Sequence, residues 1–100
     1  MKQIELKVVD AVFLGEEQDF VYKDMIKVLL EAPENPEKGA SIAEVRQALR
    51  VLDVLDESDE IMELEDADFA YLLRRIRNAK WATANKIFVD FVDYFEELDG

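Results

Sequence analysis

The feature that most constrains the fold is a helix start at Ser41 that is followed directly by a helical apolar repeat. In the Ser-Ile-Ala-Glu motif at 41–44, the Ser41 hydroxyl can accept a hydrogen bond from the Glu44 amide, and the Glu44 carboxylate can reach back to the Ser41 amide. Beyond this capping box the apolar residues are Ile42, Val45, Leu49 and Leu52. Their helical spacing predicts a helix that buries this stripe and exposes the opposite side, which carries Arg46 and Asp53.

Three further segments carry helical patterns with recognisable ends. A short helix is expected to begin at a cap on Asp24 and to end before Pro33, because the residue before a proline avoids helical angles. Another is expected after a cap at Glu65 or Asp66, and a last one after a cap at Thr83. The residues expected to face the core are Met25 or Ile26, Val28, Leu29 and Leu30 in the first, Phe69, Leu72, Leu73, Ile76 and Ala79 in the second, and Ile87, Phe88, Phe91, Val92, Phe95 and Leu98 in the third.

Strand patterns are confined to shorter segments. Apolar and charged residues alternate over 4–8, which is typical of a strand with one buried face. Residues 9–14 are more continuously apolar, and the polar stretch 15–18 before the apolar residues at 20–22 indicates a hairpin. Residues 61–64 are compatible with one more short strand. The expected fold is a single domain over 1–100, α+β but mostly α, with about four helices packed against a short N-terminal strand or hairpin.

Composition bears on function mainly by exclusion. The chain has no Cys and no His, so disulfides, thiolate nucleophiles and the usual proton shuttle at neutral pH are absent. Of the three Ser and Thr hydroxyls, those of Ser41 and Thr83 are explained as helix caps, which leaves Ser58. The acidic run 56–60 lacks the glycine and the alternating ligands of a calcium loop and is expected to be a solvated connection between helices. We therefore expect no catalytic residue, no cofactor and no metal.

The charge and hydropathy of the chain limit which classes of partner and which cellular location are expected. Twelve Lys and Arg against 24 Asp and Glu give a net charge of −12, which repels phosphates and anionic lipids. We expect neither direct nucleic-acid binding nor a membrane association. The start of the chain, 1–7, interleaves charge with apolar residues, unlike a signal peptide, and no apolar run reaches the length of a membrane span. The expected location is the cytoplasm.

A basic stretch near the end of the helix expected after Glu65 or Asp66 is the first candidate for contact with a partner. It contains Arg74, Arg75 and Arg77. If these side chains project outward together, they offer a binding patch for a phosphate backbone or an acidic partner. The alternative is that they complement the negative end of the helix dipole and pair with acids nearby.

Aromatic residues around the last helix are the second candidate. This helix and its approach are too rich in large aromatic side chains for a chain of 100 residues to bury them all, so some are expected to face a partner. The candidates are Trp81, Phe88 and Tyr94. Aromatic side chains dominate binding hot spots, and self-association through this helix to form a homo-oligomer is the simplest interaction they would support.

Several motifs together resemble a group of phage proteins. The motifs are Ser-Ile-Ala-Glu-Val-Arg at 41–46 running through Arg-Val-Leu-Asp at 50–53, Leu-Glu-Asp-Ala-Asp-Phe at 64–69 followed by Trp81, and Tyr-Lys-Asp at 22–24. In layout the chain resembles small acidic proteins encoded among the structural genes of long-tailed bacteriophages and prophages, some of which act as tail assembly chaperones or head-to-tail joining factors. The resemblance covers most of the chain as a pattern of helix caps and apolar stripes and carries no known site.

This resemblance implies a non-enzymatic factor that assists tail or head-tail assembly. Such a factor would bind a phage structural component or a host protein through an apolar helix face rimmed by acids. Two other functions stay open. An acidic mimic of nucleic acid would inhibit a host defence or DNA-binding protein and would bind with strong salt dependence. A helix-turn-helix-like regulator would use the capping-box helix and the arginine-bearing helix, although the net charge argues against it.

Overall fold

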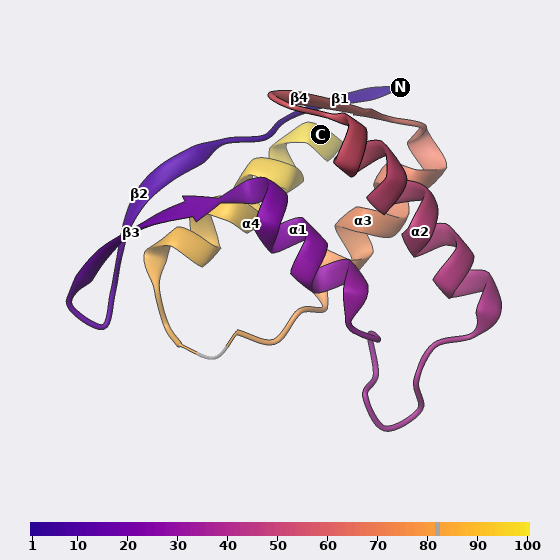
Figure 1. Ribbon diagram of the computed structural model, residues 1–100, viewed down its shortest axis with the longest axis horizontal. Helices are drawn as coiled ribbons and strands as arrows, with labels where there is room; N and C mark the ends of the chain where they lie inside the picture. Colours follow the sequence, from indigo (N-terminus) through magenta and orange to yellow (C-terminus); the bar gives the residue numbers. More distant parts are fainter. Residues whose placement is uncertain (82) are drawn as a thin grey trace.

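The chain forms four helices and two separate antiparallel sheets of two strands each (Figure 1) in the computed structural model, which describes residues 1–81 and 83–100. In chain order the elements are β1 (Lys2–Glu5), β2 (Val8–Phe13), β3 (Glu16–Val21), α1 (Tyr22–Glu31), α2 (Ile42–Glu57), β4 (Ile61–Leu64), α3 (Asp66–Arg77) and α4 (Lys86–Asp99). The four helices agree with the expected α+β class, but the expectation of one short N-terminal strand or hairpin is wrong, because the strands form two sheets and one sheet takes a strand from the middle of the chain.

The first sheet pairs β1 with β4 across more than half of the sequence. Ile4 lies opposite Met62, and both side chains are completely buried together with Leu64. Each strand has only four residues, so neither buries enough surface to be stable alone. The alternation of residues 61–64 indicated a strand, but the partner of that strand is a long-range contact that no local pattern contains.

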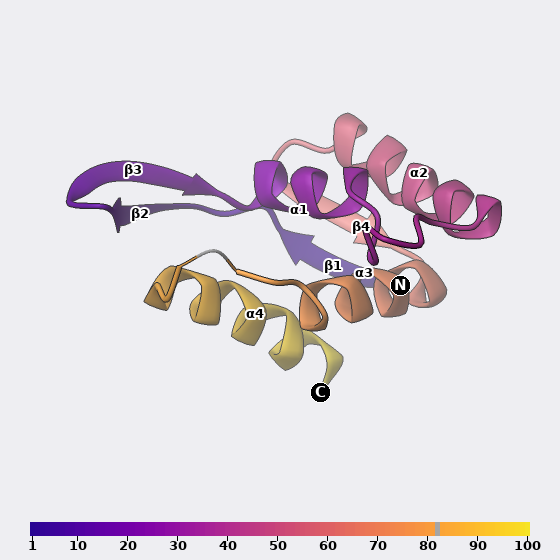
Figure 2. The ribbon, with the colours of Figure 1, turned by 90° about the horizontal axis from the view of Figure 1, so that it is seen from below.

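The second sheet is the hairpin β2–β3, which projects from the helical part of the molecule (Figure 2). Its turn consists of Leu14 and Gly15, both with positive φ, 52° and 82°. This is the two-residue geometry that matches the twist of paired strands. The predicted polar turn over 15–18 is wrong, because Glu16 already begins β3. The strand predicted over 4–8 is also divided, since β1 ends at Glu5 and β2 begins at Val8.

Helix α1 follows β3 without a break. It begins at Tyr22, so the predicted cap at Asp24 is wrong, and Asp24 lies in the first turn. Its end agrees with the prediction: Ala32, the residue before Pro33, has extended angles. Ile26 and Leu30 are buried, whereas Val28, also expected in the core, is 61% exposed.

Helix α2 starts as expected but turns a different face to the core. The Ser41 hydroxyl accepts a hydrogen bond of 3.2 Å from the Glu44 amide, which confirms the cap. The buried residues of α2 are Ala48, Val51 and Leu55. The predicted stripe is wrong, since Ile42, Val45 and Leu49 are exposed and Leu52 is only partly buried. The helix continues through Glu57, beyond the expected break at 56, and Leu55 near its end is completely buried.

Helices α3 and α4 complete the core. The cap position of α3 is Glu65, one of the two predicted residues, although its side chain makes no capping hydrogen bond. Phe69, Leu72, Leu73 and Ile76 are buried as expected. The cap of α4 is Asn85 and not Thr83: the Asn85 Oδ1 atom accepts a hydrogen bond of 3.1 Å from the Ile87 amide. No helix in the described part of the chain has both the length and the apolar character needed to cross a membrane.

Aromatic residues join α4 to the hairpin and to α1. The Phe91 ring meets Tyr22 edge-on with centroids 4.8 Å apart, and it meets Phe20 at 5.6 Å. Phe95, one turn further along α4, packs against Phe91 at 5.1 Å, and both are fully buried. Edge-to-face pairs of this kind add to the stabilisation that burial alone supplies. Most of the aromatic surface of α4 is therefore used inside the molecule.

Candidate functional site

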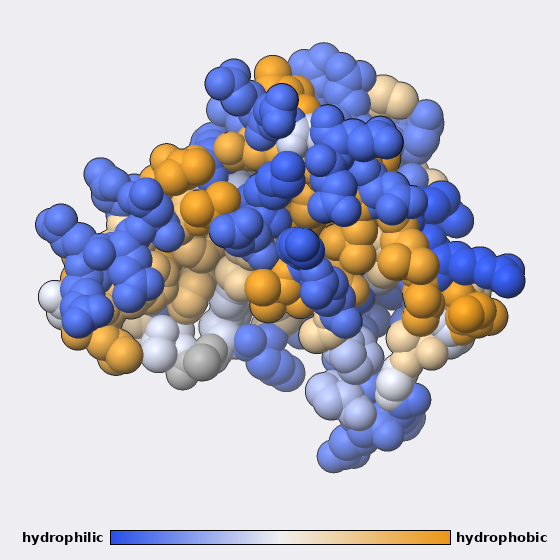
Figure 3. All heavy atoms as spheres, viewed as in Figure 1, coloured by the Kyte–Doolittle hydropathy of each residue, from blue (hydrophilic) through white to orange (hydrophobic). Residues whose placement is uncertain are grey.

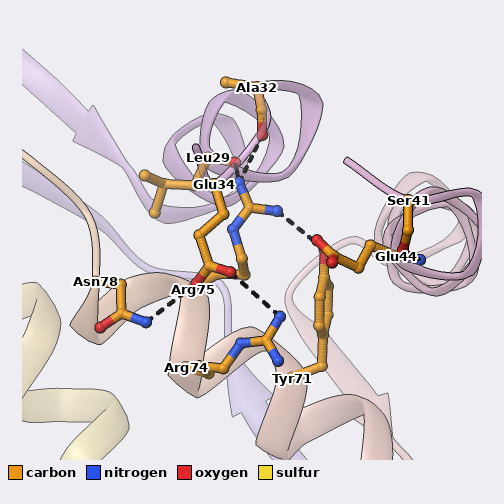
Figure 4. Close-up of polar contacts among 9 residues, drawn as sticks. All are labelled: Leu29, Ala32, Glu34, Ser41, Glu44, Tyr71, Arg74, Arg75 and Asn78. Atoms are coloured by element: carbon orange, nitrogen blue, oxygen red, sulfur yellow. Dashed lines mark hydrogen bonds and ion pairs between the residues drawn. The ribbon is translucent and has the colours of Figure 1, made fainter. Parts of the chain in front are cut away.

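The basic stretch of α3 does not form a shared surface patch, because Arg75 points inward (Figure 4). Arg75 is 8% exposed, and its guanidinium donates hydrogen bonds to the Tyr71 hydroxyl at 2.9 Å, the Leu29 carbonyl at 2.6 Å and the Ala32 carbonyl at 2.5 Å. The last carbonyls of a helix lack intrahelical donors, and Arg75 supplies donors to two of those near the end of α1. It acts as an internal clamp between α3 and α1.

The other two arginines remain closer to solvent and pair with acids of this chain. Arg74 lies 3.4 Å from the Glu34 carboxylate, and Arg77 forms a two-pronged hydrogen bond to Glu96, with a longer contact to Asp99. The hydrogen bond from Arg77 lowers the pKa of Glu96, and the same bond raises the pKa of Arg77 above its ordinary value. Local pairing, one of the two interpretations of this stretch, is the arrangement that the structure shows.

Two of the three candidate aromatic residues come together on one side of α4. The Trp81 indole stacks on the Phe88 ring, with centroids 4.6 Å apart and planes inclined by 22°. Beside them is a hollow of about 380 Å³. Its lining includes Trp81, Asn85, Phe88, Val89, Val92 and Asp93. Both aromatic rings are partly buried, and Val89 is 57% exposed, so the hollow presents apolar surface to solvent. The predicted pair Trp81 and Phe88 therefore shares a surface feature.

Tyr94, the third candidate, has an internal role instead. Its hydroxyl accepts a hydrogen bond of 2.8 Å from the Glu5 amide, and its ring packs against Tyr22. Lys7 places its ammonium 4.1 Å from the centre of the same ring. Burial raises the pKa of the Tyr94 hydroxyl. Tyr94 therefore ties the N-terminal segment to α4, and it does not line the hollow with Trp81.

A second exposed apolar surface lies on α2, where the sequence predicted core. We call Ile42, Val45 and Leu49 the α2 row. Ile42 is 66% and Leu49 is 52% exposed, and apolar atoms gather over α2 at the right of Figure 3. The row borders a groove of about 490 Å³ between α2 and the end of α1.

Sequence reasoning missed this surface because it assigned the first apolar stripe of the helix to the core. The signal that could have revealed it is a second stripe on the same helix, which consists of Ala48, Val51 and Leu55. A helix with two neighbouring apolar stripes has more apolar surface than one core contact covers, so one of them is expected to be exposed.

Among residues 1–81 and 83–100, no group of three or more acidic side chains is arranged to hold a metal ion. Both the hollow and the groove combine an apolar lining with charged side chains at the border, which is the usual anatomy of a protein interface.

Comparison of the chain with models of known protein families, with curated proteins and with solved structures finds no match. The geometry of the hollow and of the α2 row is therefore the basis for inferring a function.

Proposed function

We propose that this chain is a non-enzymatic protein-binding factor whose α4 hollow receives an apolar side chain from a basic segment of a partner polypeptide. The observation that carries the proposal is the stack of Trp81 on Phe88 beside an open apolar hollow with an acidic border. Large, rigid aromatic surfaces of this kind supply a disproportionate share of the binding energy at protein interfaces.

The apolar part of the partner is inferred from the lining. The indole of Trp81 and the ring of Phe88 form one wall, and Val89 and Val92 supply aliphatic surface from successive turns of α4. An aliphatic or aromatic side chain that enters this hollow removes apolar surface on both molecules from water. This burial is worth roughly 25 cal/mol for each Å².

The basic character of the partner segment is inferred from the negative charge around the hollow and on the whole chain. Asp93 lines the hollow, and the outward side of α4 also carries Asp90 and Glu97. Lys86 offsets Asp90 through an ion pair of 3.8 Å, which leaves the border acidic overall. The whole chain has a net charge of −12, so it attracts a cationic segment from a distance and accelerates encounter with it.

We place this binding activity in the assembly of a tailed phage, in the cytoplasm of its host. The support is the resemblance of the motifs at 41–53 and 64–69 to small acidic proteins of phage structural gene clusters. A factor of this type binds a tail or head-tail component before assembly is complete, and it needs an apolar contact surface and no catalytic group.

The test is affinity purification from cells in which the chain's own phage is assembling. We expect a structural protein of the virion to co-purify with the wild-type chain and to be lost with Val89→Arg, which fills the hollow with a cation. The matched control is Val28→Arg on α1, because Val28 is 61% exposed and lies outside the hollow. Fluorescence of Trp81, the only tryptophan, reports binding of the purified partner directly.

Three outcomes would contradict the proposal. The first is co-purification with no virion component, and the second is binding that Val89→Arg and Val28→Arg affect equally. The third is capture of a nucleic-acid-binding enzyme through a contact that collapses as salt is raised, which would favour the mimic of nucleic acid instead.

A further inference from the structure

The outer edge of β3 is a row of backbone groups that no other described strand covers. The two-residue turn makes the residues that flank it a hydrogen-bonded pair, and such pairs alternate along the hairpin. The N–H and C=O groups of Gln18 therefore point at β2, whereas those of Glu17 and Asp19 point outward. Among the residues that the structure describes, β3 pairs only with β2, and Glu17 and Asp19 are exposed.

The outer edge of β2 differs because the start of α4 covers part of it. The Asn85 side chain donates a hydrogen bond of 2.8 Å to the Val12 carbonyl, which is one of the outward-pointing groups of β2. In Figure 2, β2 lies on the α4 side of the hairpin and β3 lies away from it. The more open edge of this sheet is therefore that of β3, and an open edge is a template for a further strand.

The side chains of β3 give this edge a strong preference for cations. Glu17 and Asp19 form no ion pair with any residue that the structure describes. Asp19 lies directly opposite Asp10 of β2, and like charges in that position repel each other and weaken a hairpin. The acids therefore do not stabilise the fold. We propose that the β3 edge binds an extended, basic segment of a partner polypeptide as an added antiparallel strand.

A second copy of this chain does not suit the same edge. Two β3 strands paired about a twofold axis would bring Glu17 and Asp19 of both copies together, and their carboxylates would repel one another. Charge on an edge strand commonly prevents such self-pairing. The same charge leaves the edge open to a strand that carries Lys or Arg.

The register of the hairpin predicts the sequence pattern of the partner strand. Residues opposite Glu17 and Asp19 place their side chains on the same face as these acids, so they are expected to be Lys or Arg. The residue between them lies opposite Gln18 and turns to the other face. There a groove of about 280 Å³, whose lining includes Phe20 and Met25, can receive an apolar side chain. The recognised pattern is therefore a basic, an apolar and a basic residue in succession.

This site is separate from the hollow beside Trp81. The groove at β3 is lined by residues of β2, β3 and α1, whereas the hollow is lined by α4 and the segment before it. The inference therefore does not depend on the proposed function. Val89→Arg, which fills the hollow, should leave binding at the β3 edge unchanged.

The first test asks whether the contact is made by the backbone. The isotope-labelled full chain is titrated with the acetylated and amidated peptide Lys-Val-Lys-Val-Lys and followed by NMR. We expect the amide protons of Glu17 and Asp19 to shift and to exchange more slowly with water, because they gain acceptors. An N-methyl group on the central lysine, whose N–H faces β3, should abolish binding, whereas one on a valine, whose N–H faces solvent, should not. Equal binding by these two equally charged peptides would overturn the proposal.

The second test locates the charge that attracts the peptide. Glu17→Lys and Asp19→Lys should each weaken binding of the unmethylated peptide about tenfold. Asp19→Lys should not unfold the hairpin, because it replaces a repulsive pair with Asp10 by an attractive one. The matched control is Glu37→Lys, which alters the net charge equally at an exposed position between α1 and α2 and should bind as the wild type does. Equal weakening by the control, or a wild-type chain that does not bind the peptide, would contradict the proposal.

Discussion

The guanidinium of Arg75 donates a hydrogen bond of 2.5 Å to the backbone carbonyl of Ala32, the residue that follows α1. The last turn of α1 carries no basic side chain of its own, so a residue 43 positions later supplies the donor. Through this bond the arginine-rich end of α3 stabilises the end of a different helix. The cation lies inside the protein, where the sequence alone suggested a surface patch.

We predict that Arg75→Met lowers the free energy of unfolding by about 2–4 kcal/mol. The substitution keeps most of the aliphatic bulk but leaves the Leu29 and Ala32 carbonyls and the Tyr71 hydroxyl without their donor, and unsatisfied buried polar groups are costly. The control is Arg74→Met, which removes a half-exposed ion pair with Glu34 and a cation–π contact with the Tyr71 ring, and it should cost about 1 kcal/mol or less. Urea denaturation measures both. Equal losses would show that the Arg75 clamp is not formed.

The two faces of α2 should respond differently to truncation. Leu55→Ala removes a completely buried side chain and should lower the free energy of unfolding by about 2–4 kcal/mol. Leu49→Ala, on the α2 row, should change it by less than about 1 kcal/mol. Thermal unfolding compares the two. A larger effect at Leu49 would mean that the predicted stripe is buried after all.

A substitution at Leu14 in the hairpin turn should increase the stability of the protein. Its φ of 52° is unfavourable for leucine, and its side chain is exposed. Asparagine tolerates this conformation and is preferred in two-residue turns of this type, so Leu14→Asn should stabilise the protein by about 0.5–1 kcal/mol. Gly15→Ala, at φ 82°, should destabilise it by about 1 kcal/mol because of strain and not of crowding. A neutral result for both substitutions would contradict the turn geometry.

The contact between Arg77 and Glu96 predicts part of the loss of folding stability at acidic pH. Because Arg77 lowers the pKa of Glu96 in the folded state, the contribution of Glu96 to stability is present above its unfolded pKa of about 4.5 and is lost as pH falls through the folded value. Glu96→Gln should therefore be less stable than the wild type near pH 7, and the difference should shrink below pH 4.5. Unfolding curves across this range test it, with Glu97→Gln as the control. A difference that grows towards low pH would contradict the assignment.

Local signals in the sequence predicted several element ends correctly. The Ser41 cap, the end of α1 before Pro33 and the start of α3 after Glu65 depend on the chemistry of a few adjacent residues. A hydroxyl that caps an amide, or a proline that excludes helical angles, acts whatever the rest of the chain does. Such features can be read from the chain directly.

The amino-acid sequence by itself determined the starts of α2 and α3, the end of α1, and which residues are apolar. Only the tertiary structure decided which apolar residues face inward: on α2 it buries Val51 and exposes Leu49, and on α3 it turns Arg75 into the protein. It also decided that β1 pairs with β4. The physical reason is that periodicity describes one helix or strand at a time, whereas burial depends on which neighbours pack against it, and those neighbours come from distant parts of the chain.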